Sequence, residues 1–109
     1  DYKELVTQNL KMLILTSPGE RMMDTQFGVG LKSYLFQPNT GATYSEIETN
    51  IRKQAKKYLP FINIDRIEFT VPEDNPDLFP NNLSVSVLFT IVPLQSSAIL
   101  NVEVNNNIN

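Results

Sequence analysis

The side chains that could do acid–base chemistry in this chain are carboxylates, because its 109 residues include neither histidine nor cysteine. Without histidine there is no imidazole base, no Ser-His-Asp triad and no histidine-ligated metal. Without cysteine there is no disulfide, zinc ribbon or thiolate nucleophile. Carboxylates, lysines, tyrosines and hydroxyl groups remain, so most enzyme classes are excluded before any motif is considered.

Two pairs of carboxylates are spaced closely enough to act together. Glu20 and Asp24 lie in a turn-rich segment, and Glu46 and Glu48 lie where a helix begins. Glycoside hydrolysis needs two carboxyl groups about 5–10 Å apart, one of them with a raised pKa. Glu46 is explained as a helix cap and Glu48 as an ion-pair partner of Arg52. We therefore expect no catalytic residue, cofactor or metal, with a muralytic hydrolase that uses Glu20 and Asp24 as the alternative.

Nucleotide, nucleic-acid and membrane partners are not expected either. Gly28-Val29-Gly30 starts like a dinucleotide motif, but Ser33 replaces the third glycine and a loop precedes it. The basic run at residues 53–57 suits the solvated end of a helix, and it lacks interleaved aromatic residues. No apolar run reaches the roughly 18–20 residues of a membrane span.

Charge divides the chain into two unlike parts. Residues 1–59 carry eight basic and six acidic residues, a balance of +2. Residues 60–109 carry one basic and six acidic residues, a balance of -5, which gives the formal net charge of -3. We expect each part to meet a different partner.

Helical periodicity governs the first part. A helix is predicted from Asp1 to about Thr16, followed by an irregular connection over 17–30 and a short helix over 31–36. The first helix has a repeating apolar stripe, widened by three further residues: Tyr2, Val6, Leu10 and Leu13, with Leu5, Met12 and Leu15. A longer helix ends at Pro60, and its start fits a capping box of Thr43 with Glu46, or of Ser45 with Glu48. Its apolar face consists of Ile47, Ile51, Ala55, Tyr58 and Leu59.

Alternation with period two governs the second part. Ile67, Phe69 and Val71 predict one strand, 83–92 a second and 99–104 a third, with a loop over 72–82 and a polar tail from Asn105. Helices followed by a meander indicate an α+β fold, in which N-terminal helices pack on a small, mainly antiparallel C-terminal β-meander. We predict a single domain over 1–109, with a helical half (1–59) and a strand half (60–109).

The last strand is predicted to be an open edge of the sheet. Glu103 is the only charged residue from Ser97 to Asn109, and no proline or lysine guards this segment. A partner strand could pair there along Leu100, Asn101, Val102, Glu103 and Val104. Coverage of this edge by the first helix or by the loop is the alternative.

An ordered series of motifs from Leu10 to about Val104 resembles the small baseplate wedge proteins of contractile phage tails, which have relatives in type VI secretion baseplates. After the leucine-rich first helix, the series comprises Gly19-Glu20-Arg21, Asp24-Thr25-Gln26-Phe27-Gly28, Leu31, Leu35-Phe36, Pro38-Asn39-Thr40, Tyr58-Leu59-Pro60 and a strand starting near Ile64. The family commonly has Glu-Pro-Arg where this chain has Leu59-Pro60-Phe61. An apolar contact with helical wedge proteins is therefore expected there, unless Leu59 and Phe61 pack into the domain's own core.

The resemblance implies a non-enzymatic part of the virion that is assembled in the host cytoplasm and present in several copies in a symmetric baseplate. Its partners would be other wedge proteins and the tail sheath protein. Wedge contacts are expected at Phe27, Gly28, Tyr58, Leu59, Pro60 and Phe61. The strands 83–92 and 99–104 would pair with sheath strands and template the first sheath ring, and the sheath segment that they receive should be net basic. A regulatory adaptor on the same fold is a further alternative.

Overall fold

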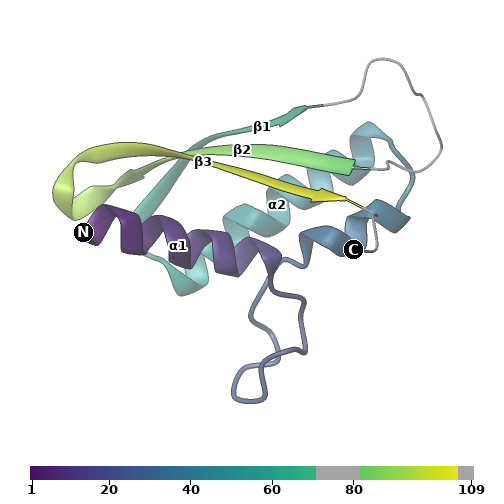
Figure 1. The fold of residues 1–109 in the computed structure, drawn as a ribbon, viewed down its shortest axis with the longest axis horizontal. Coiled ribbons are helices and arrows are strands. Elements are labelled where there is room, and N and C mark those ends of the chain that lie inside the picture. The colour runs from purple at the N-terminus through teal and green to yellow at the C-terminus, as the bar shows by residue number, and fades with distance from the viewer. Residues whose placement is uncertain (71–81, 106–109) are drawn as a thin grey trace.

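The computed structural model describes residues 1–70 and 82–105. These residues form two layers, with three helical segments on one face of an antiparallel sheet (Figure 1). In chain order the elements are α1 (Tyr2–Leu15), the 3-10 helix η1 (Leu31–Phe36), α2 (Gly41–Tyr58), β1 (Ile62–Thr70), β2 (Asn82–Ile91), the 3-10 turn η2 (Val92–Leu94) and β3 (Ser96–Asn105). The predicted α+β class, with helices before a meander, is confirmed.

The sheet has the order β1-β2-β3, and both of its strand pairs are antiparallel. The register shifts between Ile64, which faces Phe89, and Arg66, which faces Leu88. The extra residue, Asp65, forms a bulge that lets both Ile64 and Ile67 point into the core. The strand therefore starts at Ile62, before the stretch that simple alternation indicated.

Strand β2 is the central strand of the sheet, which contradicts the expectation that residues 83–92 pair with a sheath strand. Because β1 and β3 occupy both of its edges, β2 has no edge left for a strand from a partner. Only the two outer strands could accept one. Three predicted features lie outside the described residues: the end of the first strand at Val71, the loop residues 72–81 and the tail residues 106–109. Asn82, predicted to end the loop, begins β2, and Asn105, predicted to begin the tail, ends β3.

The core forms where α1, α2 and η1 meet the inner face of the sheet. Helix α1 buries Val6, Leu10, Leu13 and Ile14. The predicted stripe is confirmed at Val6, Leu10 and Leu13 but wrong at Tyr2, which is 50% exposed. The predicted widening is also wrong, since Leu5, Met12 and Leu15 are 36–57% exposed. Helix α1 packs on β3, α2 and η1 from one side only, so the apolar residues on its opposite side reach solvent.

Helix α2 begins three residues earlier than expected. Its N-cap is Thr40, whose side-chain oxygen accepts a hydrogen bond from the Thr43 amide. Both predicted capping boxes are therefore wrong, and the Thr43 hydroxyl instead donates to the carbonyl of Pro38 at 2.7 Å. The predicted apolar face is confirmed for Ile47, Ile51, Ala55 and Leu59, which are buried, and Tyr58 is half-buried.

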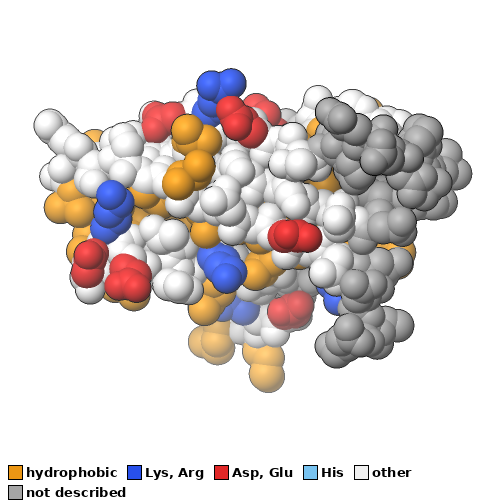
Figure 2. All heavy atoms as spheres, turned by 45° about the horizontal axis from the view of Figure 1, so that its top comes forward, with side chains coloured by type: hydrophobic (Ala, Val, Ile, Leu, Met, Phe, Trp, Pro, Cys, Tyr) orange, Lys and Arg blue, Asp and Glu red, His pale blue; other side chains and the backbone are white. Residues whose placement is uncertain are grey.

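No helix of residues 1–70 and 82–105 covers the outer face of the sheet (Figure 1). Figure 2 shows that polar side chains prevail there and that hydrophobic ones form small, separate patches. Serine and threonine alternate with the buried residues of β2, and Ile99 is an exposed apolar residue of β3. Across the described ranges 1–70 and 82–105, no helix has the length and apolar character needed to span a membrane.

Candidate interaction surfaces

Residues 17–30 form a projecting loop that leaves the helical layer on the side away from the sheet (Figure 1). The Gly19 amide donates to the carbonyl of Thr25 at 3.0 Å, which closes the tip. At the base, the Gly30 amide donates to the carbonyl of Thr16 at 2.8 Å. The loop has no regular secondary structure, as predicted, but its backbone is hydrogen-bonded at both ends.

Gly28 sets the path of the loop where it returns to the core. Its φ of 115° is in a region that residues with a Cβ rarely adopt. A Cβ placed there would overlap the carbonyl oxygen of Thr16. The position therefore requires glycine for two separate reasons, backbone conformation and close approach.

Three side chains from the last turns of α2 hold the loop. The Gln54 side chain accepts from the Gly28 amide at 2.9 Å and donates to the carbonyl of Gln26 at 3.1 Å. Lys57 donates to the side-chain oxygen of Gln26 at 3.0 Å. The Tyr58 ring meets the ring of Phe27 edge-on, with centroids 4.9 Å apart. The loop is thus fixed to α2 by contacts that cross about 30 residues of sequence.

Asp24 is a structural anchor within this network. One of its carboxylate oxygens accepts from the Gln26 amide at 3.1 Å, and the other accepts from the Tyr58 hydroxyl at 2.8 Å. The hydrogen bond from Tyr58 is the main cause that lowers the pKa of Asp24 below its ordinary value. Burial and the same hydrogen bond raise the pKa of Tyr58.

Of the candidate catalytic pair Glu20 and Asp24, Asp24 is unsuited to be the general acid. Asp24 is held as a carboxylate by Tyr58, the opposite of the raised pKa that a general acid needs. Glu20 is exposed and lines a shallow hollow with residues of α1. The other candidate, Glu48, forms the predicted ion pair with Arg52 at 3.4 Å.

The residues expected to contact the wedge fall into two groups. Phe27 and Leu59 are 8% and 7% exposed, and Gly28 is also buried, so these three mainly hold the loop and the end of α2 together. Tyr58 and Phe61 are half-buried, and Pro60 is exposed. Packing of Leu59 and Phe61 into the domain's own core, the alternative left open, is therefore confirmed for Leu59 and partly for Phe61.

Two hollows lie on either side of the contact between the projecting loop and the end of α2. One, of about 240 Å³, is lined by Asn9, Met12, Leu13, Arg21, Phe27, Tyr58 and Leu59. The other, of about 460 Å³, runs between α2 and β1 and is lined by Arg52, Ala55, Lys56, Pro60, Ile62, Asn63 and Ile64. Both have apolar floors and basic residues at their margins.

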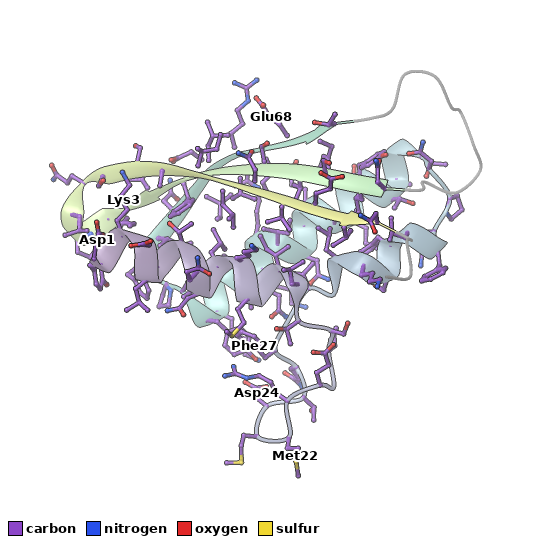
Figure 3. All side chains as sticks on the ribbon, viewed as in Figure 1. Asp1, Lys3, Met22, Asp24, Phe27 and Glu68 are labelled. Atoms are coloured by element: carbon purple, nitrogen blue, oxygen red, sulfur yellow. The ribbon has the colours of Figure 1, made fainter. Side chains whose placement is uncertain are left out.

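The tip of the projecting loop was missed by sequence reasoning. Met22 and Met23 are 96% and 98% exposed, and Met22 points away from the rest of the molecule (Figure 3). Two adjacent methionines in a segment predicted to be irregular were the available signal, because methionine is usually buried.

The predicted strand-pairing residues lie on β3, an outer strand. Leu100, Val102 and Val104 point inward and are buried, and Asn101 and Glu103 are exposed on the outer face. Helix α1 packs on β3, but no strand of the described residues pairs with the outer edge of β3. A partner could therefore reach the backbone edge and the outward side chains without disturbing the core.

Comparison with known proteins places these surfaces in context. The family model for the baseplate wedge protein gp25 (GPW_gp25) matches residues 1–93. The match therefore ends before β3. A crystal structure of a "putative tail lysozyme" from Geobacter sulfurreducens is similar, with a TM-score of 0.80 at 17% identity over 99% of this chain and 94% of that one. A chain of the anti-feeding prophage baseplate gives a TM-score of 0.60 at 19% identity over 96% of this chain and 70% of that one. No curated protein matches the sequence.

Proposed function

This chain belongs to the GPW_gp25 family of baseplate wedge proteins, and from that premise we propose that it is a structural part of a contractile-tail baseplate, linking the wedge to the sheath. Its fold, shared with a chain of the anti-feeding prophage baseplate, supports this role. It would act in the baseplate of the tail, after assembly in the host cytoplasm, in several copies arranged symmetrically.

The proposed sheath contact is the outer edge of β3, which would accept a sheath strand and so template the first sheath ring. The observation that carries this proposal is the open, unguarded state of this edge. An unpaired strand edge offers a row of backbone donors and acceptors, and proteins usually block such edges with charges, bulges or proline. Glu103 is the one charged residue of β3, and the strand has ten regular residues without proline.

The opposite edge, β1, shows what a guarded edge looks like. It has a bulge at Asp65 and carries Arg66 and Glu68, which form an ion pair at 2.7 Å. Arg52 from α2 also donates to the Ile64 carbonyl at 2.9 Å, so part of its backbone is already engaged. The contrast between the two edges favours β3 as the edge that pairs.

Wedge proteins would contact the opposite, helical side of the molecule. The hollow of about 240 Å³ at the junction of α1, α2 and the projecting loop provides an apolar floor for such contacts. Of the six expected residues, Tyr58, Pro60 and Phe61 are accessible enough to touch a partner directly. Phe27, Gly28 and Leu59 would act by holding the surface in shape.

Charge supports two different partners. The helical half has a balance of +2 and the strand half one of -5, so we expect a net basic sheath segment at β3. Such a contact should weaken as ionic strength rises, because exposed charge pairs are screened.

The test is sheath polymerisation on baseplates that carry the double variant Asn101→Lys/Glu103→Lys. Both residues are exposed, so the domain should fold. Lysines on an edge strand oppose strand addition, and they also repel a basic partner. We expect initiation of sheath polymerisation to fall at least about tenfold, which corresponds to roughly 1.4 kcal/mol.

The matched control is Asn63→Lys/Glu68→Lys on the other edge strand. It makes the same two residue changes at exposed positions of β1 and adds the same charge. Normal sheath on the control and lost sheath on the β3 variant would support strand pairing at β3. Normal sheath on baseplates containing the folded β3 variant would refute it.

Proline is a less clean probe of this edge than lysine. Val102 is 3% exposed and pairs with Val85 in the core, so Val102→Pro would destabilise the fold itself. Asn101 is exposed, and its side-chain oxygen accepts from the Ser86 hydroxyl at 2.6 Å. Asn101→Pro is informative only if its circular dichroism spectrum and thermal midpoint match those of the parent.

Cell-wall hydrolysis is the second candidate function, favoured by the name of the similar Geobacter sulfurreducens protein. It predicts that the pure protein lyses peptidoglycan and that Glu20→Gln abolishes this activity. The engagement of Asp24 by Tyr58 argues against Asp24 as its general acid, so Glu20 would have to take that role. Hydrolysis above the blank at acid or neutral pH, lost in Glu20→Gln, would establish it, and no turnover would remove it.

A further inference from the structure

The outer edge of β3 is unpaired over residues 98–104. Within the described ranges 1–70 and 82–105, β3 pairs with β2 alone (Figure 1). Helix α1 packs on β3, but no backbone–backbone hydrogen bond of the described residues reaches 98–104 apart from those of the β2–β3 pair. An edge that is open to a strand from another protein is also open to an identical strand, unless its own sequence opposes that pairing.

Two copies of β3 that pair antiparallel are related by a two-fold axis perpendicular to the sheet. Such an axis keeps the helical layers of both copies on the same face of the joined sheet. Inward side chains therefore lie opposite inward ones, and outward side chains lie opposite outward ones. Whether β3 can pair with itself depends on which residues each register brings together.

A register centred on Asn101 suits the outer face of the strand. Asn101 would face its counterpart across the axis, and Glu103 would face the exposed Ile99, so no like charges meet. A register centred on Glu103 would place two carboxylates directly opposite each other, which is unfavourable. The Asn101 side-chain oxygen accepts from the Ser86 hydroxyl at 2.6 Å, and its NH2 group can donate to the second copy.

The same register matches apolar side chains on the inner face. Leu100 would lie opposite Val102, and Ala98 would lie opposite Val104. A register centred on Leu100 would instead place the polar Ser96 opposite Val104. Because all four apolar residues already belong to the core or pack against it, the two cores would continue across the joined edge.

Net charge makes the self-pairing weak. Each copy has a formal net charge of -3, and its strand half has a balance of -5, so two copies joined at β3 repel each other. A single pair of strands also buries less surface than the interface of a stable dimer. Because salt screens this repulsion, self-pairing should strengthen as ionic strength rises. The contact with a basic sheath strand should respond in the opposite direction.

We propose that free copies of this chain pair through β3 in the register centred on Asn101, forming a reversible dimer that a basic strand displaces. The pairing covers an edge that would otherwise favour aggregation. A basic strand is attracted where a second copy is repelled, so the exchange favours the basic strand. The displacement step rests on the proposed function, whereas the pairing of free copies does not.

Sedimentation equilibrium of the pure protein tests the dimer. We expect the average mass to rise toward twice that of the monomer as concentration increases. The dissociation constant should fall at least about threefold between about 50 mM and about 500 mM salt. A monomer at every concentration up to about 1 mM would overturn the proposal, and so would a dimer that weakens as salt is added.

Charge exchange at Asn101 tests the edge and the register. Asn101→Asp and Asn101→Lys each place like charges opposite across the axis, so each variant alone should pair at least about threefold more weakly than the parent. An equimolar mixture of the two variants should form the heterodimer in about tenfold excess over either homodimer, as measured by native mass spectrometry. A statistical mixture of the three dimers would overturn the register.

Asn9→Asp is the matched control for Asn101→Asp. It makes the same change at an exposed position of α1 that lines the hollow beside the projecting loop. Both residues are exposed, so both variants should fold, and the control should pair as the parent does. Equal weakening in the two variants would show that net charge alone governs association, and it would overturn pairing at β3.

Sheath polymerisation on baseplates separates the inference from the proposed function. Asn101→Asp should leave sheath initiation unchanged or increased, because a carboxylate there attracts a basic strand. Reduced initiation in this variant would overturn displacement by a basic strand. A parent chain that is monomeric and still initiates sheath would overturn self-pairing and leave the proposed function intact. A dimeric chain that is absent from purified baseplates would do the reverse.

Discussion

The Tyr58 hydroxyl donates a hydrogen bond to a carboxylate oxygen of Asp24 at 2.8 Å, across 34 residues of sequence. Asp24 lies in the projecting loop and Tyr58 in the last turn of α2, so this bond ties the loop to the helical layer. It also engages one of the two candidate catalytic carboxylates in holding the loop. The loop can therefore present its tip in a defined position.

Removing this bond should change the response to acid. The pKa of Asp24 is lowered in the folded state, so its contribution to stability is present above the ordinary value of 3.8 and is lost as pH falls through the lowered pKa. In Tyr58→Phe we expect the pKa of Asp24 to rise toward that value, and we expect the loss of stability as pH falls below 3.8 to become shallower. Carboxyl titration by NMR and urea unfolding against pH measure both. An unchanged pKa of Asp24 would show that Tyr58 is not its main partner.

The half-buried Gln54 should matter to the loop more than a polar residue on a helix usually does. Gln54→Ala removes the acceptor for the Gly28 amide and the donor to the Gln26 carbonyl. We expect a loss of about 1–2 kcal/mol in the free energy of unfolding and faster hydrogen exchange at the Gly28 amide. Thr49→Ala, at an exposed position of the same helix, is the control. Equal exchange rates in both variants would contradict the tether.

Glycine substitutions should separate sharply by position. Gly28→Ala places a methyl group onto the Thr16 carbonyl in a strained backbone region, so we expect a loss of about 3 kcal/mol or more. Gly41→Ala has open space around its Cβ at the start of α2 and should be neutral or stabilising by up to about 1 kcal/mol. Thermal and urea unfolding measure both. Similar stabilities of the two variants would mean that Gly28 does not control the loop.

The start of α2 can be located by removing each candidate cap. Thr40→Ala should cost about 1 kcal/mol, because Thr40 caps the helix in the structure. Glu46→Ala, which a capping box at Thr43 would make costly, should stay within about 0.5 kcal/mol. Urea unfolding of the two variants decides between the alternatives. A larger loss of unfolding free energy in Glu46→Ala than in Thr40→Ala would favour a capping box at Thr43.

Much of the fold could be predicted because it depends on local periodicity. The repeat of Ile47, Ile51 and Ala55 defines the buried face of α2, and alternation from Leu83 defines the inward residues of β2. The absence of cysteine and histidine excluded the enzyme and metal sites that depend on thiolate or imidazole side chains. These features are properties of residue type and spacing, so they do not depend on what lies next to them.

Other features depended on neighbours that are distant in sequence. Leu5 and Met12 look like core residues in a helical pattern, but α1 contacts β3, α2 and η1 mainly through its other side, and both side chains are more than half exposed. Helical spacing shows which residues share a face and not which face is covered. The cap at Thr40 was missed because Thr43 and Glu46 match the capping-box motif, whereas Thr40 is followed by Thr43 and does not.

The sequence by itself determined the element types, the α+β order, the charge difference between the halves and the few side chains left for chemistry. The tertiary structure decided which strands have an open edge, since the strand order β1-β2-β3 places β2 in the centre and β1 and β3 at the edges. It also decided that Asp24 anchors the loop and that the methionines lie on the surface. Local spacing specifies secondary structure, whereas exposure, pairing and pKa follow from contacts that form only when distant segments meet.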